Sequence, residues 1–398
     1  MLDPKEIKNV KFVENPREYS SEIPRSLSPD ETESVRKVHF ALPTYEPTPL
    51  VELKALASKL GLRSILVKDE SMRFGLKAFK GLGGVYAVFR AICERFGVEC
   101  IAATIDDLRR DTLLMKAVSQ LHLVTATDGN HGKGVSWAAG MLGCQAHVYM
   151  PVGSLEVRAQ AIRDAGNAEV RIMDLSYDDS VRYAEQMSKE HGWLLIQDTS
   201  WDGYEVVPSW IIQGYSTLVY ESVEQMKALG YDRPTHIFLQ AGVGAMAGGV
   251  LGVFRNLYDD DMPYVAIAEP DQAACIYESI KWNDGNPHAA TGNGDTIMAG
   301  LNCGEPCTIT WPTIRDTAAW SFSCADYVSV VGTKVLAEPL PGDPAIESGE
   351  SGSVTTGLLY TICTDPEFAE LRRGMHLDEN SVVYIVNTEG YTNPDLEK

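Results

Sequence analysis

The sequence predicts an α/β fold made of two open, mostly parallel, doubly wound sheets with helices on both faces. Three observations predict it: the chain has 398 residues, short β-branched runs alternate with helical stretches, and glycine-rich segments follow several of these runs. A length of 398 residues exceeds what one hydrophobic core usually organises. We therefore expect a large domain formed by 1–85 and 191–398 and a smaller inserted α/β domain at 86–190.

The alternation of strands and helices continues along most of the chain. The segment 237–254 is apolar, but it contains Gln240 and five glycines, so it predicts a strand, a glycine loop and a helix rather than a membrane span. Strands that alternate with helices are typically parallel and bind ligands at their carboxyl ends. The expected strands are 64–67, 121–126, 146–150, 169–173, 193–197, 235–239, 264–268 and 382–386, and the expected helices are 79–96, 133–142, 156–165, 177–190 and 245–258.

The composition is that of an ordinary folded protein, with 44% hydrophobic and 22% charged residues. A net charge of −21 without a Lys/Arg tract argues against nucleic acid and anionic membranes as partners. The first six residues carry charges where a signal peptide needs an apolar core, so we expect a cytoplasmic protein. The eight cysteines are dispersed, and Cys303 and Cys307 have no nearby His or Cys to complete a zinc site, so we expect free thiols and no metal.

The first glycine-associated segment, 68–84, reads Lys-Asp-Glu-Ser-Met-Arg-Phe-Gly-Leu-Lys-Ala-Phe-Lys-Gly-Leu-Gly-Gly. Its Lys80 lies at a helix start in an apolar setting, where desolvation and the helix dipole lower the pKa of an ammonium group. A lysine that forms an imine needs such a pKa. Two alternatives remain open at this point: Lys80 is a surface lysine of an amphipathic helix, or Lys77, three residues earlier, is the reactive one.

Two further segments follow predicted strands. The first, 127–134, reads Thr-Asp-Gly-Asn-His-Gly-Lys-Gly and taken alone indicates a turn. The second, 240–249, reads Gln-Ala-Gly-Val-Gly-Ala-Met-Ala-Gly-Gly and leads from a strand into a helix, where unobstructed backbone N–H groups can bind a phosphate. It lacks the Gly-Lys-Ser/Thr ending of a nucleoside-triphosphate loop, and it comes too late in the chain for an N-terminal dinucleotide motif.

Together the three segments resemble the fold type II pyridoxal-phosphate enzymes, the group of serine and threonine dehydratases, cysteine synthase and tryptophan synthase β. Within this group the sequence is most similar to the diaminopropionate ammonia-lyases, over nearly the whole range from 45 to 390. The motifs that carry this resemblance lie at 68–80, 127–132, 197–204, 240–249 and 297–306.

The resemblance implies a homodimer that holds pyridoxal phosphate between a large and a small domain. It implies that Lys80 is the Schiff-base lysine and that Asn130 is the partner of the 3-hydroxyl group. A neutral hydroxyl of Thr388 at the pyridine nitrogen would leave that nitrogen largely unprotonated, which suits elimination. The alternative for Thr388 is a polar residue that ends a buried strand. The implied phosphate cradle consists of Gly242, Val243, Gly244, Ala245 and Met246.

The same resemblance implies roles for two aspartates. Asp128 is the candidate base on the cofactor face opposite Lys80, and Asp198 is the candidate partner of the substrate's β-ammonium or of a proton transfer. Either could instead be a turn or cap residue. The implied reaction is elimination of ammonia from D- and L-2,3-diaminopropionate, giving aminoacrylate and then pyruvate and a second ammonia.

Two other functions stay open on the sequence alone. One is a serine or threonine dehydratase of the same fold, against which both aspartates argue. The other is a catalytically silent protein that binds pyridoxal phosphate. Lys77 also departs from the family pattern, because a neutral polar residue is expected at its position, and an inward-pointing cation there would bring the substrate into question.

Overall fold

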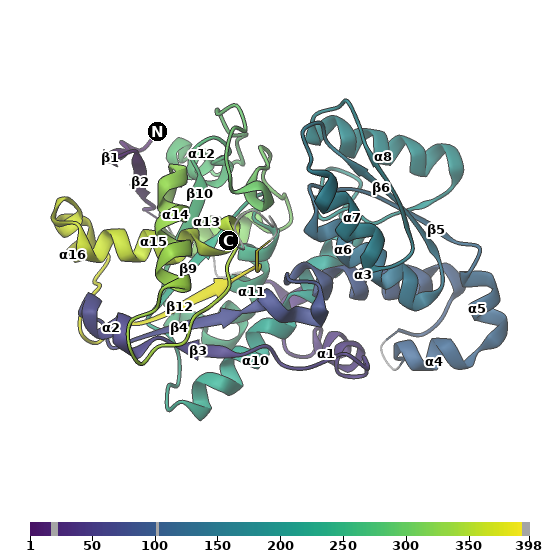
Figure 1. Cartoon of the computed structure of the whole chain (residues 1–398), viewed down its shortest axis with the longest axis horizontal. Helices are drawn as coiled ribbons and strands as arrows, with labels where there is room; N and C mark the ends of the chain where they lie inside the picture. Colours follow the sequence, from purple (N-terminus) through teal and green to yellow (C-terminus); the bar gives the residue numbers. More distant parts are fainter. Residues whose placement is uncertain (17–22, 101–102, 392–398) are drawn as a thin grey trace. The chain divides into compact units, whose positions relative to one another are not determined.

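The computed structural model describes residues 1–16, 23–100 and 103–391. The chain forms two compact units, one made of 1–24, 47–72 and 218–398 (unit 1) and the other of 25–46 and 73–217 (unit 2). Each unit contains one β-sheet (Figure 1). The range 86–190, which the sequence assigns to the smaller domain, lies inside unit 2.

The sheet of unit 1 has eight strands and is parallel in its centre. Strands β11, β10, β9, β12 and β4 run parallel to one another, whereas β1, β2 and β3 join antiparallel at the edges. Strands β4 and β12 come from opposite ends of the chain and are neighbours in the sheet (Figure 1). The strand order is β1 (Lys5–Ile7), β2 (Val10–Glu14), β11 (Ala318–Cys324), β10 (Tyr264–Pro270), β9 (His236–Gln240), β12 (Val382–Asn387), β4 (Ser64–Asp69) and β3 (Leu50–Glu52).

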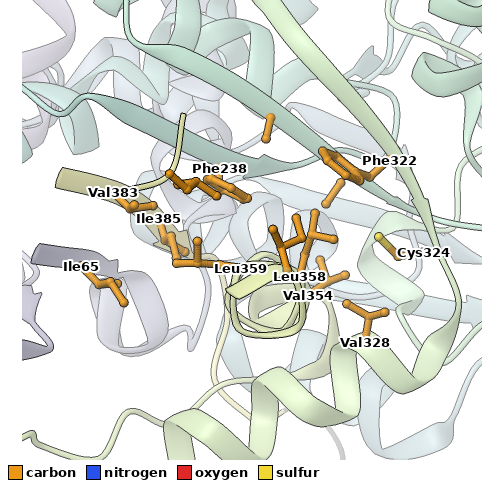
Figure 2. Close-up of a cluster of buried hydrophobic side chains, with 14 of the residues drawn as sticks. Ile65, Phe238, Phe322, Cys324, Val328, Val354, Leu358, Leu359, Val383 and Ile385 are labelled. Carbon is orange, nitrogen blue, oxygen red and sulfur yellow. The ribbon is translucent and has the colours of Figure 1, made fainter. Parts of the chain in front are cut away.

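Helix α15 (Glu350–Thr364) is the central helix of the unit 1 core, because nearly its whole length is buried. Figure 2 shows side chains of the sheet facing this helix, and burial of such apolar area is the main favourable term in folding. The buried residues labelled there are Ile65, Phe238, Phe322, Cys324, Val383 and Ile385 of the strands, Val354, Leu358 and Leu359 of α15, and Val328 of α14.

Further helices complete unit 1. They are α2 (Lys54–Leu60), α10 (Ser216–Ala228), which begins two residues before the boundary of the unit, α11 (Ala245–Tyr258), α12 (Cys275–Trp282), α13 (Trp311–Thr317), α14 (Asp326–Ala337) and α16 (Ala369–Gly374). Short 3-10 turns are formed by Glu70–Gly75 (across the unit boundary), Asp259–Asp261, Ala299–Leu301 and Pro366–Phe368.

Unit 2 contains a four-stranded sheet in which every neighbouring pair is parallel. Its strand order is β7 (Ala168–Ile172), β6 (Gln145–Met150), β5 (His122–Ala126) and β8 (Leu194–Leu195). Its helices are α1 (Glu33–Phe40), α3 (Lys80–Phe96), α4 (Ile105–Arg110), α5 (Thr112–Val118), α6 (Asn130–Leu142), α7 (Glu156–Ala165), α8 (Tyr177–His191) and α9 (Val206–Gly214), with a 3-10 turn at Arg25–Leu27.

Helix α3 packs directly against the backbones of α6 and α9. A Cβ atom on Gly214 of α9 would lie 2.7 Å from Cα of Gly83, and one on Gly134 of α6 would lie 3.1 Å from the carbonyl oxygen of Lys80. Such distances leave no room for a side chain, so glycine is required at these crossings. The first turn of α3, which carries Lys80, is thereby held between two helices.

Most of the predicted elements are confirmed, and helices 156–165 and 245–258 have the predicted bounds. The strand predicted at 193–197 is wrong in extent, since β8 covers only Leu194–Leu195. The reason is that the backbone N–H of Gln197 donates to the hydroxyl of Tyr204 and not to a neighbouring strand. Strand β11 was not predicted, because its sequence Ala-Ala-Trp-Ser-Phe-Ser-Cys contains no β-branched residue.

The apolar segment 237–254 forms β9, the glycine loop and α11, as predicted. In the part of the chain that the structure describes, no helix is long and apolar enough to cross a membrane.

Candidate active site

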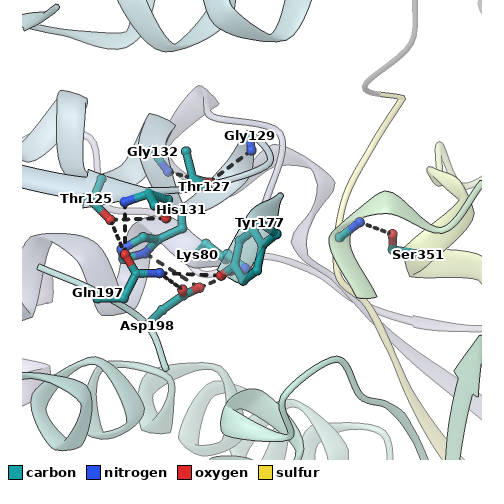
Figure 3. A network of polar contacts seen from close by, with 12 residues as sticks. Lys80, Thr125, Thr127, Gly129, His131, Gly132, Tyr177, Gln197, Asp198 and Ser351 are labelled. Atoms are coloured by element: carbon teal, nitrogen blue, oxygen red, sulfur yellow. Dashed lines mark hydrogen bonds and ion pairs between the residues drawn. The ribbon is translucent and has the colours of Figure 1, made fainter. Parts of the chain in front are cut away.

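Lys80 is the first residue of α3, and its side chain is 16% exposed. Its ammonium Nζ donates a hydrogen bond to Oδ2 of Asp198 at 2.9 Å (Figure 3). Lys77, the alternative reactive lysine, precedes the helix and adopts a left-handed backbone conformation with a φ of 56°. The structure thus brings two of the predicted catalytic residues, Lys80 and Asp198, into direct contact.

Asp198 follows β8 and is 7% exposed. Burial alone would raise the pKa of its carboxyl group, but neighbouring His131 and Lys80 and the hydrogen bond from Lys80 lower that pKa to about 2. Asp198 is therefore a carboxylate at neutral pH. A buried carboxylate beside an amine is suited to hold a positive charge at this point.

His131 is the third member of this cluster and is 1% exposed. Its Nε2 donates to the carbonyl oxygen of Ile196 at 2.7 Å, and its Nδ1 lies 3.8 Å from Oδ2 of Asp198. Burial lowers the pKa of His131, and the charge of Lys80 adds to this lowering, while Asp198 opposes it. His131 belongs to the motif 127–132, but the sequence predicts no role for it. Its position in that motif is the feature of the sequence that could have identified it as a site residue.

A hydrogen-bond network fixes the segment that carries Asp198 (Figure 3). Oε1 of Gln197 accepts from the hydroxyl of Thr125 at 3.1 Å and from the backbone N–H of Ala126 at 2.9 Å, both in β5. The hydroxyl of Tyr204 accepts from the N–H of Gln197 at 2.9 Å and donates to the carbonyl oxygen of Leu195 at 2.8 Å. Gln197 and Tyr204 belong to the motif 197–204, and their role in the described structure is to position Asp198.

The segment 127–129 joins β5 to α6, and the hydroxyl of Thr127 accepts the hydrogen bonds that fix this turn. The Thr127 hydroxyl accepts from the backbone N–H groups of Gly129 at 3.0 Å and Gly132 at 3.2 Å. Asp128 is half-buried and close enough to His131 to raise the pKa of that histidine. Asn130 is half-buried as well and opens α6. Asp128 therefore lies within electrostatic reach of the Lys80, Asp198 and His131 cluster.

In unit 1, the glycine loop leads from β9 into the 14-residue helix α11. Gly244 has a φ of +90° and precedes the first residue of the helix, Ala245. Gly242 lies against the backbone of Leu301, where a Cβ atom would be 3.3 Å from the Leu301 Cα. The first N–H groups of a helix have no partner within it and favour an anion. The predicted residues Gly242 to Met246 therefore form a local structure that suits a phosphate group.

Thr388 directly follows β12 and is 4% exposed. Its hydroxyl Oγ1 accepts a hydrogen bond from Nε2 of Gln240, the last residue of β9, at 3.0 Å. Unit 1 thus places Thr388 next to the strand end from which the glycine loop starts. The sequence places Gln240 first in the motif 240–249 but does not predict its contact with Thr388.

Within the described ranges, no group of three or more His, Cys, Asp or Glu side chains could hold a metal ion. All eight cysteines are free thiols. In the described residues, unit 2 contributes a half-buried lysine beside a buried carboxylate, and unit 1 contributes a glycine loop whose local structure suits an anion.

Comparison with known proteins defines the class to which this fold and these residues belong. The family model described as pyridoxal-phosphate dependent enzyme matches residues 41–338. That match covers most of the chain and contains Lys80, Asp128, Asn130, Asp198 and the glycine loop. The predicted fold class of pyridoxal-phosphate enzymes is confirmed.

Within this class, the chain belongs to the diaminopropionate ammonia-lyase family. It is 46% identical over 359 residues to the diaminopropionate ammonia-lyase of Salmonella typhimurium, covering 90% of this chain and 88% of the relative. It is 44% identical over 375 residues to that of Escherichia coli K12, covering 94% and 92%. The crystal structure of the Escherichia coli enzyme in complex with an aminoacrylate-PLP azomethine reaction intermediate has a TM-score of 0.88 and 40% identity and covers 99% of this chain and 96% of that one.

Pyridoxal phosphate is the cofactor of this family. The residues described above fit its chemistry. The amine of Lys80, held beside a carboxylate, can join the aldehyde group, and the loop at the start of α11 can receive the phosphate.

Proposed function

We propose that this chain catalyses the pyridoxal-phosphate-dependent elimination of ammonia from D- and L-2,3-diaminopropionate. The products are aminoacrylate and ammonia, and aminoacrylate hydrolyses to pyruvate and a second ammonia. The observation that carries the proposal is the 2.9 Å contact between Nζ of Lys80 and the buried carboxylate of Asp198. The diaminopropionate ammonia-lyases, at up to 46% identity, support the same activity.

In this proposal the cofactor is held by residues that the sequence singled out. Lys80 bonds to it covalently, Asn130 hydrogen-bonds its 3-hydroxyl, Thr388 hydrogen-bonds its pyridine nitrogen, and residues Gly242 to Met246 bind its phosphate. Bound pyridoxal phosphate supplies an electron-withdrawing ring that acidifies the Cα–H bond of an attached amino acid. The protein's own residues then move the protons.

Lys80 and Asp128 are the proposed bases at Cα, one for each face of the substrate. Once its amine is released by the incoming amino acid, Lys80 can take the Cα proton of one enantiomer. Asp128 can take the proton of the other enantiomer from the opposite face. General base catalysis of this kind contributes roughly 10²–10⁴-fold to a rate.

Asp198 is the proposed binding group for the β-ammonium of the substrate. Because its pKa is lowered to about 2, Asp198 is a poor proton donor at neutral pH and a good partner for a cation. When Lys80 gives up its ammonium charge, a substrate ammonium can replace it beside Oδ2 of Asp198. Serine and threonine carry no such charge at Cβ, so this carboxylate favours diaminopropionate over them.

In the elimination, the Cα–H electron pair becomes the Cα–Cβ double bond, and the Cβ–N bond breaks with its electron pair on nitrogen. An amine must leave protonated, and the β-ammonium held by Asp198 already carries that proton. The Cα proton remains on the base that removed it until it exchanges with solvent.

A homodimer and a cytoplasmic location complete the proposal. The family resemblance supports the dimer. Sedimentation of the holoprotein at micromolar concentration tests the dimer, which requires a particle of twice 43.6 kDa.

The direct test is release of pyruvate by the purified, cofactor-loaded protein. The substrates are D- and L-2,3-diaminopropionate, with D- and L-serine and L-threonine in parallel. Turnover of both diaminopropionate enantiomers far above the hydroxy amino acids is expected. Turnover of serine or threonine alone would identify a dehydratase, and a cofactor-bound protein that is inactive on all five would be a silent binding protein.

Two single variants test the lysine assignment. Lys80→Ala should abolish the visible absorbance of cofactor bound to a lysine, whereas Lys77→Ala should preserve it. The reverse result would transfer the covalent role to Lys77.

A further inference from the structure

We infer that Gln240 is a positioning residue: its side-chain amide orients the hydroxyl of Thr388 so that the hydroxyl proton is presented to the pyridine nitrogen of the cofactor. The inference deepens the proposed function and rests on the role proposed there for Thr388. It adds a residue, and a direction for one proton, that the family resemblance does not supply.

The orientation of the Gln240 amide follows from the atoms around it. Its Nε2 lies 3.0 Å from the carbonyl oxygen of Val386, 3.1 Å from that of Ser351 and 3.0 Å from Oγ1 of Thr388. Carbonyl oxygens can only accept hydrogen bonds, so the edge of the amide that faces them must be its NH₂ group. An amide nitrogen cannot accept a hydrogen bond, so in the contact between Nε2 and Oγ1 of Thr388, Gln240 is the donor and Thr388 the acceptor.

The contact with Gln240 determines where the hydroxyl proton of Thr388 can point. A hydroxyl has one proton and two lone pairs, and one lone pair of Thr388 is used by Gln240. Its proton cannot lie between Oγ1 and the NH₂ group, and so it points elsewhere. A pyridine nitrogen that receives a proton donor is stabilised in its unprotonated form, because the hydrogen bond is made to the neutral state.

The surroundings hold Gln240 in this orientation. Gln240 is 1% exposed and ends β9, while Val386 belongs to the neighbouring strand β12 and Ser351 to the first turn of α15. The Ser351 hydroxyl in turn accepts from the backbone N–H of Gly300 at 3.0 Å (Figure 3). Acceptors on β12 and α15 thus hold the NH₂ group of the amide in place, and a flipped amide would turn its oxygen toward their carbonyl oxygens.

The amide oxygen of Gln240 does not help to hold the side chain. Oε1 of Gln240 is buried and has no hydrogen-bond partner among the residues that the structure describes. The side chain is therefore held through its NH₂ edge alone, and an apolar residue of similar length would fill the same volume without donating. Such a variant separates the proton-orienting role from packing.

The experiment measures the ¹⁵N chemical shift of the pyridine nitrogen in holoprotein loaded with ring-¹⁵N pyridoxal phosphate. In the wild type we expect the shift of an unprotonated, hydrogen-bonded nitrogen from pH 6 to 9. In Gln240→Met the Thr388 hydroxyl loses the group that orients it, and the shift should move toward that of an unprotonated nitrogen without a hydrogen-bond donor. Thr388→Ser keeps the hydroxyl and should resemble the wild type.

Gln213→Met is the matched control. Gln213 is a buried glutamine of α9 whose Nε2 donates to a backbone carbonyl, that of Ser26, and whose Oε1 also lacks a partner among the described residues. Its replacement should leave the ¹⁵N shift unchanged. A wild-type shift in Gln240→Met, or an equal change in both variants, would overturn the inference.

A second measurement keeps the inference testable if Gln240→Met does not fold. The wild-type apoprotein is titrated with pyridoxal phosphate and with its 1-deaza analogue, in which a C–H group replaces the ring nitrogen. One net hydrogen bond corresponds to about a 2- to 10-fold preference for the natural cofactor, and Thr388→Val should lose it. If the wild-type apoprotein binds pyridoxal phosphate and the 1-deaza analogue with equal affinity, Thr388 does not donate a hydrogen bond to the pyridine nitrogen, and the inference is wrong.

Failure of the proposed function gives a different pattern. If the wild-type protein binds no pyridoxal phosphate, or binds it with a protonated ring nitrogen at pH 7, the role of Thr388 itself is wrong, and the inference about Gln240 falls with it. Correct wild-type spectra with an unaffected Gln240→Met would reject the inference and leave the proposed function intact.

Discussion

Removing the charge of Asp198 tests the central ion pair without the cofactor. Asp198→Asn keeps the shape of the side chain and deletes the partner of the Lys80 ammonium, and Lys80→Met deletes the ammonium and keeps most of its length. A lowering of the Asp198 pKa from 3.8 to about 2 corresponds to about 2 kcal/mol of extra stabilisation of the charged form. The lowering is shared between His131 and Lys80, so the double-mutant cycle of these two changes, which isolates the part due to Lys80, should give a coupling energy between about 0.5 and 2 kcal/mol at pH 7.

The assay is urea unfolding of the cofactor-free protein for the wild type, both single variants and the double variant. The exposed pair of Lys189 and Glu185, 2.7 Å apart on one helix, is the matched control and should give about 0.3–0.5 kcal/mol. A coupling of Lys80 and Asp198 no larger than this control would refute the reasoning from burial.

The pH dependence of this coupling has a definite sign. Because the pKa of Asp198 is lower in the folded state than in the unfolded state, its stabilisation is complete above about pH 4 and is lost as the pH falls toward about 2. The coupling energy should therefore be constant from pH 5 to 7 and decline only below about pH 4. A coupling that declines between pH 7 and 5 would point to titration of His131 and not of Asp198.

Three further outcomes are expected. Gly214→Ala forces a methyl group to within 2.7 Å of the Gly83 backbone and should destabilise the apoprotein by about 1–3 kcal/mol in urea unfolding. Gly304→Ala, where no atom lies within 4 Å of the added methyl group, should not reproduce this effect. Burial raises the pKa of Glu269 from 4.5 to about 8, so the folded state keeps a proton that the unfolded state releases, and the stability of the protein should fall as the pH rises from about 4.5 to 8. Glu269→Gln should flatten this pH dependence of stability in thermal unfolding, and an unchanged dependence would contradict the raised pKa. Asp128→Asn should lower kcat by roughly 10²–10⁴-fold for one enantiomer of diaminopropionate and much less for the other, whereas equal losses would reject Asp128 as the base of one face only.

The order of elements was predictable where local chemistry is strong. The helices at 156–165 and 245–258 have clear apolar periodicity and glycine boundaries, and both have the predicted bounds. Strand β11 contains no β-branched residue and becomes a strand because it pairs between β10 and β2. Tertiary pairing decides such a segment, and local propensity cannot reveal it.

The candidate site residues could be proposed from the sequence for a different reason. Lys80, Asp128, Asn130 and the glycine loop lie in short motifs that the chain shares with one family of cofactor-dependent enzymes. The contacts between these residues could not be predicted from the motifs. His131 reaches Asp198, 67 positions later in the chain, only because β5 and β8 are adjacent in the sheet.

The sequence by itself determined the α/β class and the family and supplied the candidate site residues, because these depend on periodicity and on motifs that are local in the chain. Only the tertiary structure decided that Asp198 is a buried carboxylate against Lys80 and that the amide of Gln240 donates to Thr388. The physical reason is that a side chain's charge state and the direction of its proton depend on burial and on neighbours distant in sequence. Those neighbours are brought together by the packing of α3 against α6 and by the pairing of β5 with β8 and of β9 with β12.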